Sequence, residues 1–95
     1  MSGVDPFFSD LSGYAAGFLT TAAFLPQVLK TYRSRSARDI SLVMYLVFTA
    51  GIVLWLIHGL LAGSGPVVAA NSVGLLLSVA MVVMKIVFDR SGPGK

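Results

Sequence analysis

The chain is 95 residues long, 56% hydrophobic and free of cysteine, with a formal net charge of +3. Its charges leave two gaps, residues 11–29 and 40–84, without Asp, Glu, Lys or Arg. A membrane-spanning helix needs about 20 apolar residues, so the first gap holds one span and the second holds two spans and a turn. A soluble domain of this size has too little interior to bury three such stretches. The composition therefore predicts one integral membrane domain over residues 1–95. It excludes disulfides, and the basic residues flank apolar segments rather than marking a nucleic-acid partner.

The first predicted span runs from about residue 11 to residue 30, after a short polar lead that contains Phe7 and Phe8. Gly13 and Gly17 are four residues apart and therefore share one helix face. Small residues at this spacing let a second helix come close. The first half of the span is thus suited to tight packing against another helix.

The stretch Phe24-Leu25-Pro26-Gln27 interrupts this span. Pro26 removes a backbone N–H, and its ring clashes with the carbonyl four residues earlier, which costs a soluble helix roughly 3 kcal/mol. Gln27 adds an amide that lipid cannot hydrogen-bond. A plain membrane anchor needs neither feature, so the stretch predicts a bend with a function.

The connector, residues 31–39, is the most basic part of the chain and contains Arg33, Arg35 and Arg38. The positive-inside rule places it in the cytoplasm, and contact with lipid head groups accounts for its charge. A role in binding substrate is the less favoured alternative. Asp39 is expected to cap the second helix.

Two further spans are predicted, from about residue 40 to 61 and from residue 66 to about 88. The uncharged turn 62–65 joins them, and Pro66 suits the first turn of a helix, where its missing N–H costs nothing. Three spans then place the N-terminus outside and the basic tail after Phe88, which we expect to be frayed, in the cytoplasm.

Trp55 and Asn71 are the candidate binding residues. At 1.5 Å per residue, each lies roughly 6–7 Å outside the middle of its own span, so the two share one level. Intramembrane polar residues usually face a bundle interior or a water-filled cavity. An aromatic face beside a neutral amide suits a sugar, which offers C–H faces and hydroxyls. The alternatives are an interhelical hydrogen bond for Asn71 and a core or lipid-facing position for Trp55.

The sequence places no carboxylate between Asp10 and Asp39 or between Asp39 and Asp89. Proton-coupled transporters generally need an intramembrane carboxylate, so passive, uncoupled transport is favoured. His58 is the only titratable side chain deep in a span, and we interpret it as a polar residue near the outer interface rather than a proton relay. No catalytic constellation, metal-ligand set or cofactor motif is present, so we expect no enzyme activity, metal or cofactor.

Three packed helices enclose no channel wide enough for a sugar, so a transporting chain must associate with itself. A parallel two-fold dimer places six helices around one axis and presents each residue twice. Transporters built from repeats bind their substrate near the midplane, at the interface between the repeats.

These motifs together resemble the SemiSWEETs, the bacterial half-sized relatives of the SWEET sugar transporters in the PQ-loop (MtN3/saliva) group. The similarity covers about residues 10–88. The Pro-Gln dipeptide alone is weak, but four blocks at these spacings are specific. The blocks are Phe24-Leu25-Pro26-Gln27-Val28, Arg38-Asp39-Ile40-Ser41 followed by Met44-Tyr45, Leu54-Trp55, and Ala70-Asn71 with Pro66 five residues before the Asn.

The resemblance implies an all-α bundle of three transmembrane helices packed in the order 1-3-2. It implies assembly as a parallel six-helix homodimer in the bacterial inner membrane, carrying a mono- or disaccharide by alternating access. The implied roles are substrate binding by Trp55 and Asn71 of both protomers, a hinge at Pro26 and Gln27, and an inner gate of Phe24 and Met44.

The outer gate departs from the family pattern. Family members close it with Tyr, Arg and Asp at three, seven and nine residues after the Trp, where this chain has His58, Ala62 and Ser64. An Arg–Asp lock is therefore impossible, and His58 is the candidate plug. Two other functions stay open: a PQ-loop transporter of another small solute such as an amino acid, and a membrane interaction subunit that does not transport.

Overall fold

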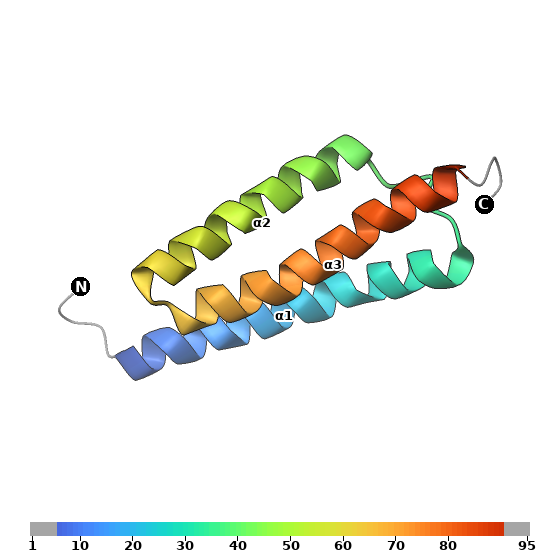
Figure 1. Cartoon of the computed structure of the whole chain (residues 1–95). Helices are drawn as coiled ribbons and strands as arrows, with labels where there is room; N and C mark the ends of the chain where they lie inside the picture. Colours follow the sequence, from blue (N-terminus) through green and yellow to red (C-terminus); the bar gives the residue numbers. More distant parts are fainter. Residues whose placement is uncertain (1–5, 91–95) are drawn as a thin grey trace.

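The computed structural model describes residues 6–90, which form three α-helices: α1 (Pro6–Ser34), α2 (Leu42–Ala62) and α3 (Gly65–Arg90) (Figure 1). The all-α prediction is confirmed. Helix α1 begins at Pro6, within the stretch expected to be a polar lead, because proline is favoured at the first position of a helix. The first five residues of that lead and residues 91–95 of the expected frayed tail lie outside the described residues.

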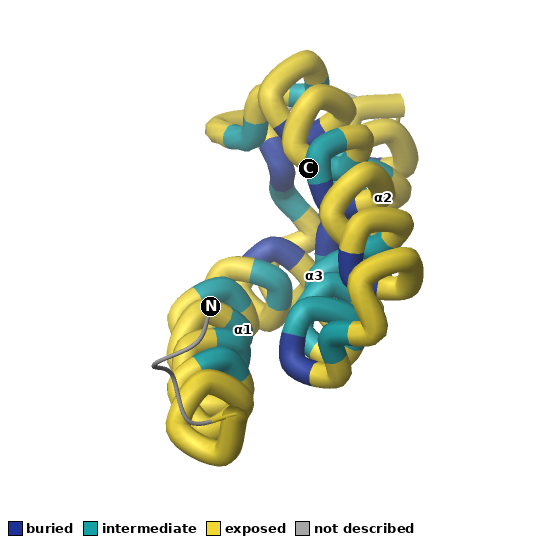
Figure 2. Tube along the Cα trace, turned by 90° about the vertical axis from the view of Figure 1, so that its left-hand side faces the viewer, coloured by how far each residue is buried: buried dark blue, intermediate teal, exposed yellow. Residues whose placement is uncertain are grey.

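Helix α3 is the centre of the bundle. Within residues 6–90, α1 and α2 each pack on α3 and their backbones do not approach one another. Figure 2 shows the same arrangement, with intermediate and buried residues where the outer helices face α3 and exposed surface elsewhere. The packing order 1-3-2 is confirmed. We call the end at Gly63 the turn end and the end at residues 35–41 the connector end.

Glycines bring α3 close to both neighbours near the turn end. A Cβ atom added at Gly13 would lie 2.6 Å from Pro66, and one added at Gly17 would lie 2.8 Å from Ala70. Such contacts are too short for real side chains, so only glycine permits this approach. The expected packing role of Gly13 and Gly17 is confirmed. On the other side of α3, a Cβ at Gly59 would lie 2.7 Å from Val67.

The cap of α2 differs from the prediction. Ser41, not Asp39, is the N-cap: its hydroxyl oxygen accepts a hydrogen bond from the backbone N–H of Met44 at 3.1 Å. The backbone N–H of Ile40 is engaged in a turn with the carbonyl of Ala37 at 3.1 Å. This turn delays the start of the helix by two residues, which leaves Asp39 outside capping position.

The connector is fastened to the end of α3. Lys85 donates a hydrogen bond to the carbonyl of Ala37 at 3.0 Å and pairs with Asp89 at 2.8 Å. The guanidinium carbon of Arg35 lies 5.9 Å from the ring centroid of Phe88, within range of a cation–π contact. The connector is therefore attached to α3, and Arg35 does more than contact lipid.

Helices α2 and α3 are each long and apolar enough to cross a bilayer, and both expose most of that surface. Leu61, for example, is 84% exposed. Within the described residues α1 does not meet the same measure, because it contains Pro26 and Gln27 as well as more small and hydroxyl side chains. Several of the small and hydroxyl side chains pack on α3 or line the cavity described next.

Candidate functional site

A cavity of about 490 Å³, open along one side of the protomer, lies between the outer helices and α3. It brings together three of the residues predicted from the sequence to be functional, Trp55, Asn71 and Phe24, from three different helices. The expected shared level of Trp55 and Asn71 is thus matched by a shared cavity. The lining residues are Thr20, Thr21, Phe24, Phe48, Gly51, Ile52, Trp55, Ala70, Asn71 and Gly74.

Asn71 is held by its own helix. Its side-chain Nδ2 donates to the carbonyl of Val67 at 2.9 Å. No donor within residues 6–90 reaches its Oδ1, and no buried side-chain oxygen or nitrogen there lacks a partner, so Oδ1 is accessible. Asn71 therefore lines the cavity with its Nδ2 engaged and its Oδ1 available as an acceptor.

The Trp55 side chain is exposed rather than packed in the core of the protomer. It is 56% exposed, and His58 one turn further along α2 meets it edge to face, with ring centroids 5.6 Å apart and planes at 84°. Both rings line a shallow hollow of about 360 Å³ with Gly51 and Leu54. His58 thus supports the orientation of Trp55, and its role at the outer gate stays a prediction.

The cavity continues toward the turn end. An adjoining hollow of about 320 Å³ shares Thr20, Trp55, Ala70 and Asn71 with the cavity and reaches Gly13 and Pro66. The small residues that let α1 approach α3 also leave this passage unfilled. The site is therefore connected to the turn end of the protomer.

At the connector end of the cavity, three aromatic rings pack against one another. Phe24 of α1 stacks on Tyr45 with centroids 6.1 Å apart and meets Phe48 edge to face at 6.0 Å. Tyr45 and Phe48 of α2 also meet edge to face at 6.0 Å. We call Phe24, Tyr45 and Phe48 the aromatic barrier. It contains the predicted gate residue Phe24 and two residues of α2 that the gate prediction did not include.

Beyond the barrier lies a polar groove of about 580 Å³ between α1 and the connector. Pro26 and Gln27 line it, together with the positively charged residues Lys30 and Arg38. The Gln27 side-chain oxygen accepts a hydrogen bond from the hydroxyl of Tyr45. Gln27, one of the two predicted hinge residues, is thus directly bonded to the barrier.

Met44 lies elsewhere in this protomer. It is 55% exposed and does not line the cavity. Its assignment to the inner gate stays a prediction, which requires a contact with a second copy of the chain.

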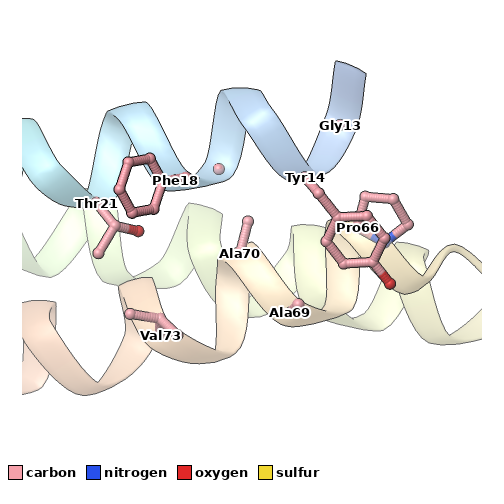
Figure 3. Close-up of a pocket in the computed structure, with 9 residues that line it drawn as sticks. Gly13, Tyr14, Phe18, Thr21, Pro66, Ala69, Ala70 and Val73 are labelled. Carbon is pink, nitrogen blue, oxygen red and sulfur yellow. The ribbon is translucent and has the colours of Figure 1, made fainter. Parts of the chain in front are cut away.

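A separate hollow of about 210 Å³ lies between α1 and α3 near the turn end. Figure 3 shows Tyr14 beside Pro66 at one end of it and Thr21 with Val73 at the other. It is lined mainly by apolar groups and includes neither Trp55 nor Asn71. Within residues 6–90 no three His, Asp or Glu side chains lie together as a metal site would require.

The PQ loop repeat family matches residues 8–68, which include most of α1, the connector, α2 and the start of α3. The chain belongs to the PQ-loop family. The sugar transporter SemiSWEET of Bradyrhizobium diazoefficiens is 51% identical over 83 residues, which cover 87% of this chain and 96% of that protein. The resemblance to the SemiSWEETs is confirmed.

Solved structures agree with the sequence relationship. A bacterial homologue of SWEET transporters is 42% identical, covers 85% of this chain and 98% of its own, and superposes with a TM-score of 0.81. SemiSWEET in the inward-open conformation is 37% identical, covers 88% of this chain and 90% of its own, and also gives 0.81. The chain is therefore an all-α membrane protein with the three-helix fold of these PQ-loop structures.

Proposed function

We propose that the chain is an uncoupled sugar transporter that carries a mono- or disaccharide by alternating access. The observation that supports this most is the cavity lined both by the exposed residue Trp55 and by Asn71, whose Oδ1 accepts no hydrogen bond within residues 6–90. Relatives named sugar transporters are similar over most of this chain. A sugar stacks its C–H face on an aromatic ring and donates hydroxyls to an amide oxygen, whereas this cavity offers no carboxylate for a cation.

The proposed working unit is a parallel homodimer. The cavity is open along the side of the protomer, and a single Trp55 and Asn71 contact only one face of a sugar. A second copy related by a parallel two-fold axis supplies the same pair from the opposite side. Met44, exposed in one protomer, would then meet its counterpart near Phe24 and complete the inner gate.

The proposed membrane is the bacterial inner membrane, with the connector end in the cytoplasm and the turn end outside. The support is the charge of the connector, since cytoplasmic loops carry the excess of Lys and Arg. Pro26, with Gln27, acts as the hinge of α1, Phe24 and Met44 close the cytoplasmic side, and His58 lies at the outer mouth.

Sugar binding can be tested directly because Trp55 is the only tryptophan. We expect saturable changes in its fluorescence when glucose or sucrose is titrated into the purified chain. Asn71→Ala should reduce sugar flux into proteoliposomes by about tenfold or more, because loss of the amide leaves a sugar hydroxyl without its hydrogen-bond partner. Ser72→Ala, which removes a polar group from the exposed neighbouring position of α3, is the matched control.

The two other functions predict different outcomes. Saturable amino-acid flux without sugar flux would identify a PQ-loop transporter of another solute. Unchanged Trp55 fluorescence, together with no flux of either solute by an intact dimer, would favour an interaction subunit in which Pro26 and Asn71 only pack helices.

A further inference from the structure

Gln27 lies next to the proposed hinge residue, but a hinge does not by itself require an amide side chain. Pro26 alone removes the backbone N–H that would stiffen the helix. In the structure the Gln27 side chain has a specific partner, because its Oε1 accepts the hydrogen bond of the Tyr45 hydroxyl. The partner belongs to α2, so the bond joins two helices.

This bond lies where α1 and α2 would otherwise be independent. Their backbones do not meet over the described residues, because α3 lies between them. Side chains make the link near the connector end: Phe24 packs against Tyr45 and Phe48, and Gln27 accepts from Tyr45. Separation of the connector halves of α1 and α2 must break these contacts.

Tyr45 is the residue of α2 that contacts both Phe24 and Gln27 of α1. It is 3% exposed, in contrast to its neighbour Met44. A buried hydroxyl without a hydrogen-bond partner is unfavourable. The hydrogen bond to Gln27 therefore stabilises Tyr45 in its buried position. The ring of Tyr45 stacks on Phe24 while its hydroxyl holds Gln27, three residues further along α1.

The link also marks the boundary between two spaces. Phe24 lines the cavity that contains Trp55 and Asn71, whereas Gln27 lines the polar groove on the connector side. A solute passing from one to the other must cross the level of Tyr45. The arrangement therefore couples the position of the hinge to closure of the aromatic barrier.

We propose that Tyr45 is a gate-positioning residue: its hydroxyl holds Gln27 and thereby keeps the connector half of α1 closed against α2. This inference rests on the proposed transport function, to which it adds the residue that sets the balance between closed and open states. Loss of the hydroxyl shifts that balance toward the open state at the connector end.

The experiment measures the distance between α1 and α2 in the absence of sugar. Because the chain has no cysteine, spin labels can be placed at Lys30→Cys and Val43→Cys, two exposed positions. Dilution with unlabelled chain restricts the measurement to one protomer. Tyr45→Phe should increase the ratio of long to short distances by about fivefold, the population change expected for one net hydrogen bond.

Tyr32→Phe is the matched control, since it removes an exposed phenol hydroxyl at the same end of α1. Gln27→Leu should produce the same shift as Tyr45→Phe, and the double variant should add nothing further. An unchanged distance distribution in both single variants would overturn the proposal, as would effects that add in the double variant. A merely structural role would lower the unfolding temperature without lengthening the distance in folded protein. Since no sugar is present, failure here is distinct from failure of Trp55 to respond to sugar.

Discussion

At the scale of single residues, the helical glycines fall into packing positions and cavity positions. A Cβ at Gly17 would lie 2.8 Å from the Cβ of Ala70, whereas one at Gly51 would meet nothing within 4 Å. Gly17 therefore sets the distance between α1 and α3, and Gly51 leaves space beside Trp55. The spacing of Gly13 and Gly17 predicted a packing role for Gly17, whereas no comparable spacing revealed that Gly51 borders the cavity.

Gly17→Ala should lower the free energy of unfolding by about 1–3 kcal/mol, because the added methyl group forces α1 away from α3. Gly51→Ala is the control and should leave stability unchanged or raise it by up to about 1 kcal/mol, since alanine favours helix. Denaturant unfolding of the purified chain in detergent measures both. Equal destabilisation by the two substitutions would show that the close approach at Gly17 does not limit packing.

Residue spacing predicted the depth of side chains better than their direction. The axial rise of a helix is constant, so the common level of Trp55 and Asn71 could be computed from the sequence. The direction in which a side chain points around the helix axis was harder to predict. From Phe48, a step of four residues leads back to Met44 and a step of three to Tyr45, and both steps stay on one helix face. The structure turns Tyr45 inward, and only the packing of α2 against α3 decides between the two.

At the scale of elements, α1 is the helix whose backbone hydrogen bonds are interrupted by a proline. It continues from Pro6 to Ser34 through Pro26, so the carbonyl of Ala22 lacks its usual donor four residues later. The connector that follows is fastened to α3 through Lys85 and Ala37. A movement of the connector half of α1 therefore needs flexure at Pro26. The Pro-Gln motif predicted a bend at this position, and that bend stays a prediction, whereas the fastening of the connector depends on contacts between residues 48 positions apart, which no local pattern reveals.

Pro26→Ala should slow sugar transport while leaving the fold intact. The substitution restores the N–H and stiffens α1. If bending then costs even half of the roughly 3 kcal/mol associated with a helix-interior proline, turnover falls about tenfold. Initial uptake rates in proteoliposomes measure turnover, and gel filtration measures assembly. Leu25→Ala keeps its backbone N–H and serves as the control, and normal transport by Pro26→Ala would count against the hinge.

At the scale of the whole molecule, the bundle has an open face rather than a closed interior. Its passage runs from the turn end through the cavity and stops at the aromatic barrier, with the polar groove beyond. Helix number and order followed from the sequence and the family resemblance. The state of the gates did not, because one sequence must support both states of a transporter with a small difference in free energy.

The charge of the side chains that line the passage bears on whether transport is coupled to protons. The cavity and the hollow at the turn end are lined by neutral side chains, and His58 contacts Trp55, which lines both of them. Proton coupling generally uses an intramembrane carboxylate. Radiolabelled sugar in proteoliposomes should therefore equilibrate to the external concentration, and no higher, with or without an inward proton gradient. His58→Gln should leave that plateau unchanged. Accumulation above the external concentration under the gradient, abolished by His58→Gln, would instead make His58 a proton relay and refute uncoupled transport.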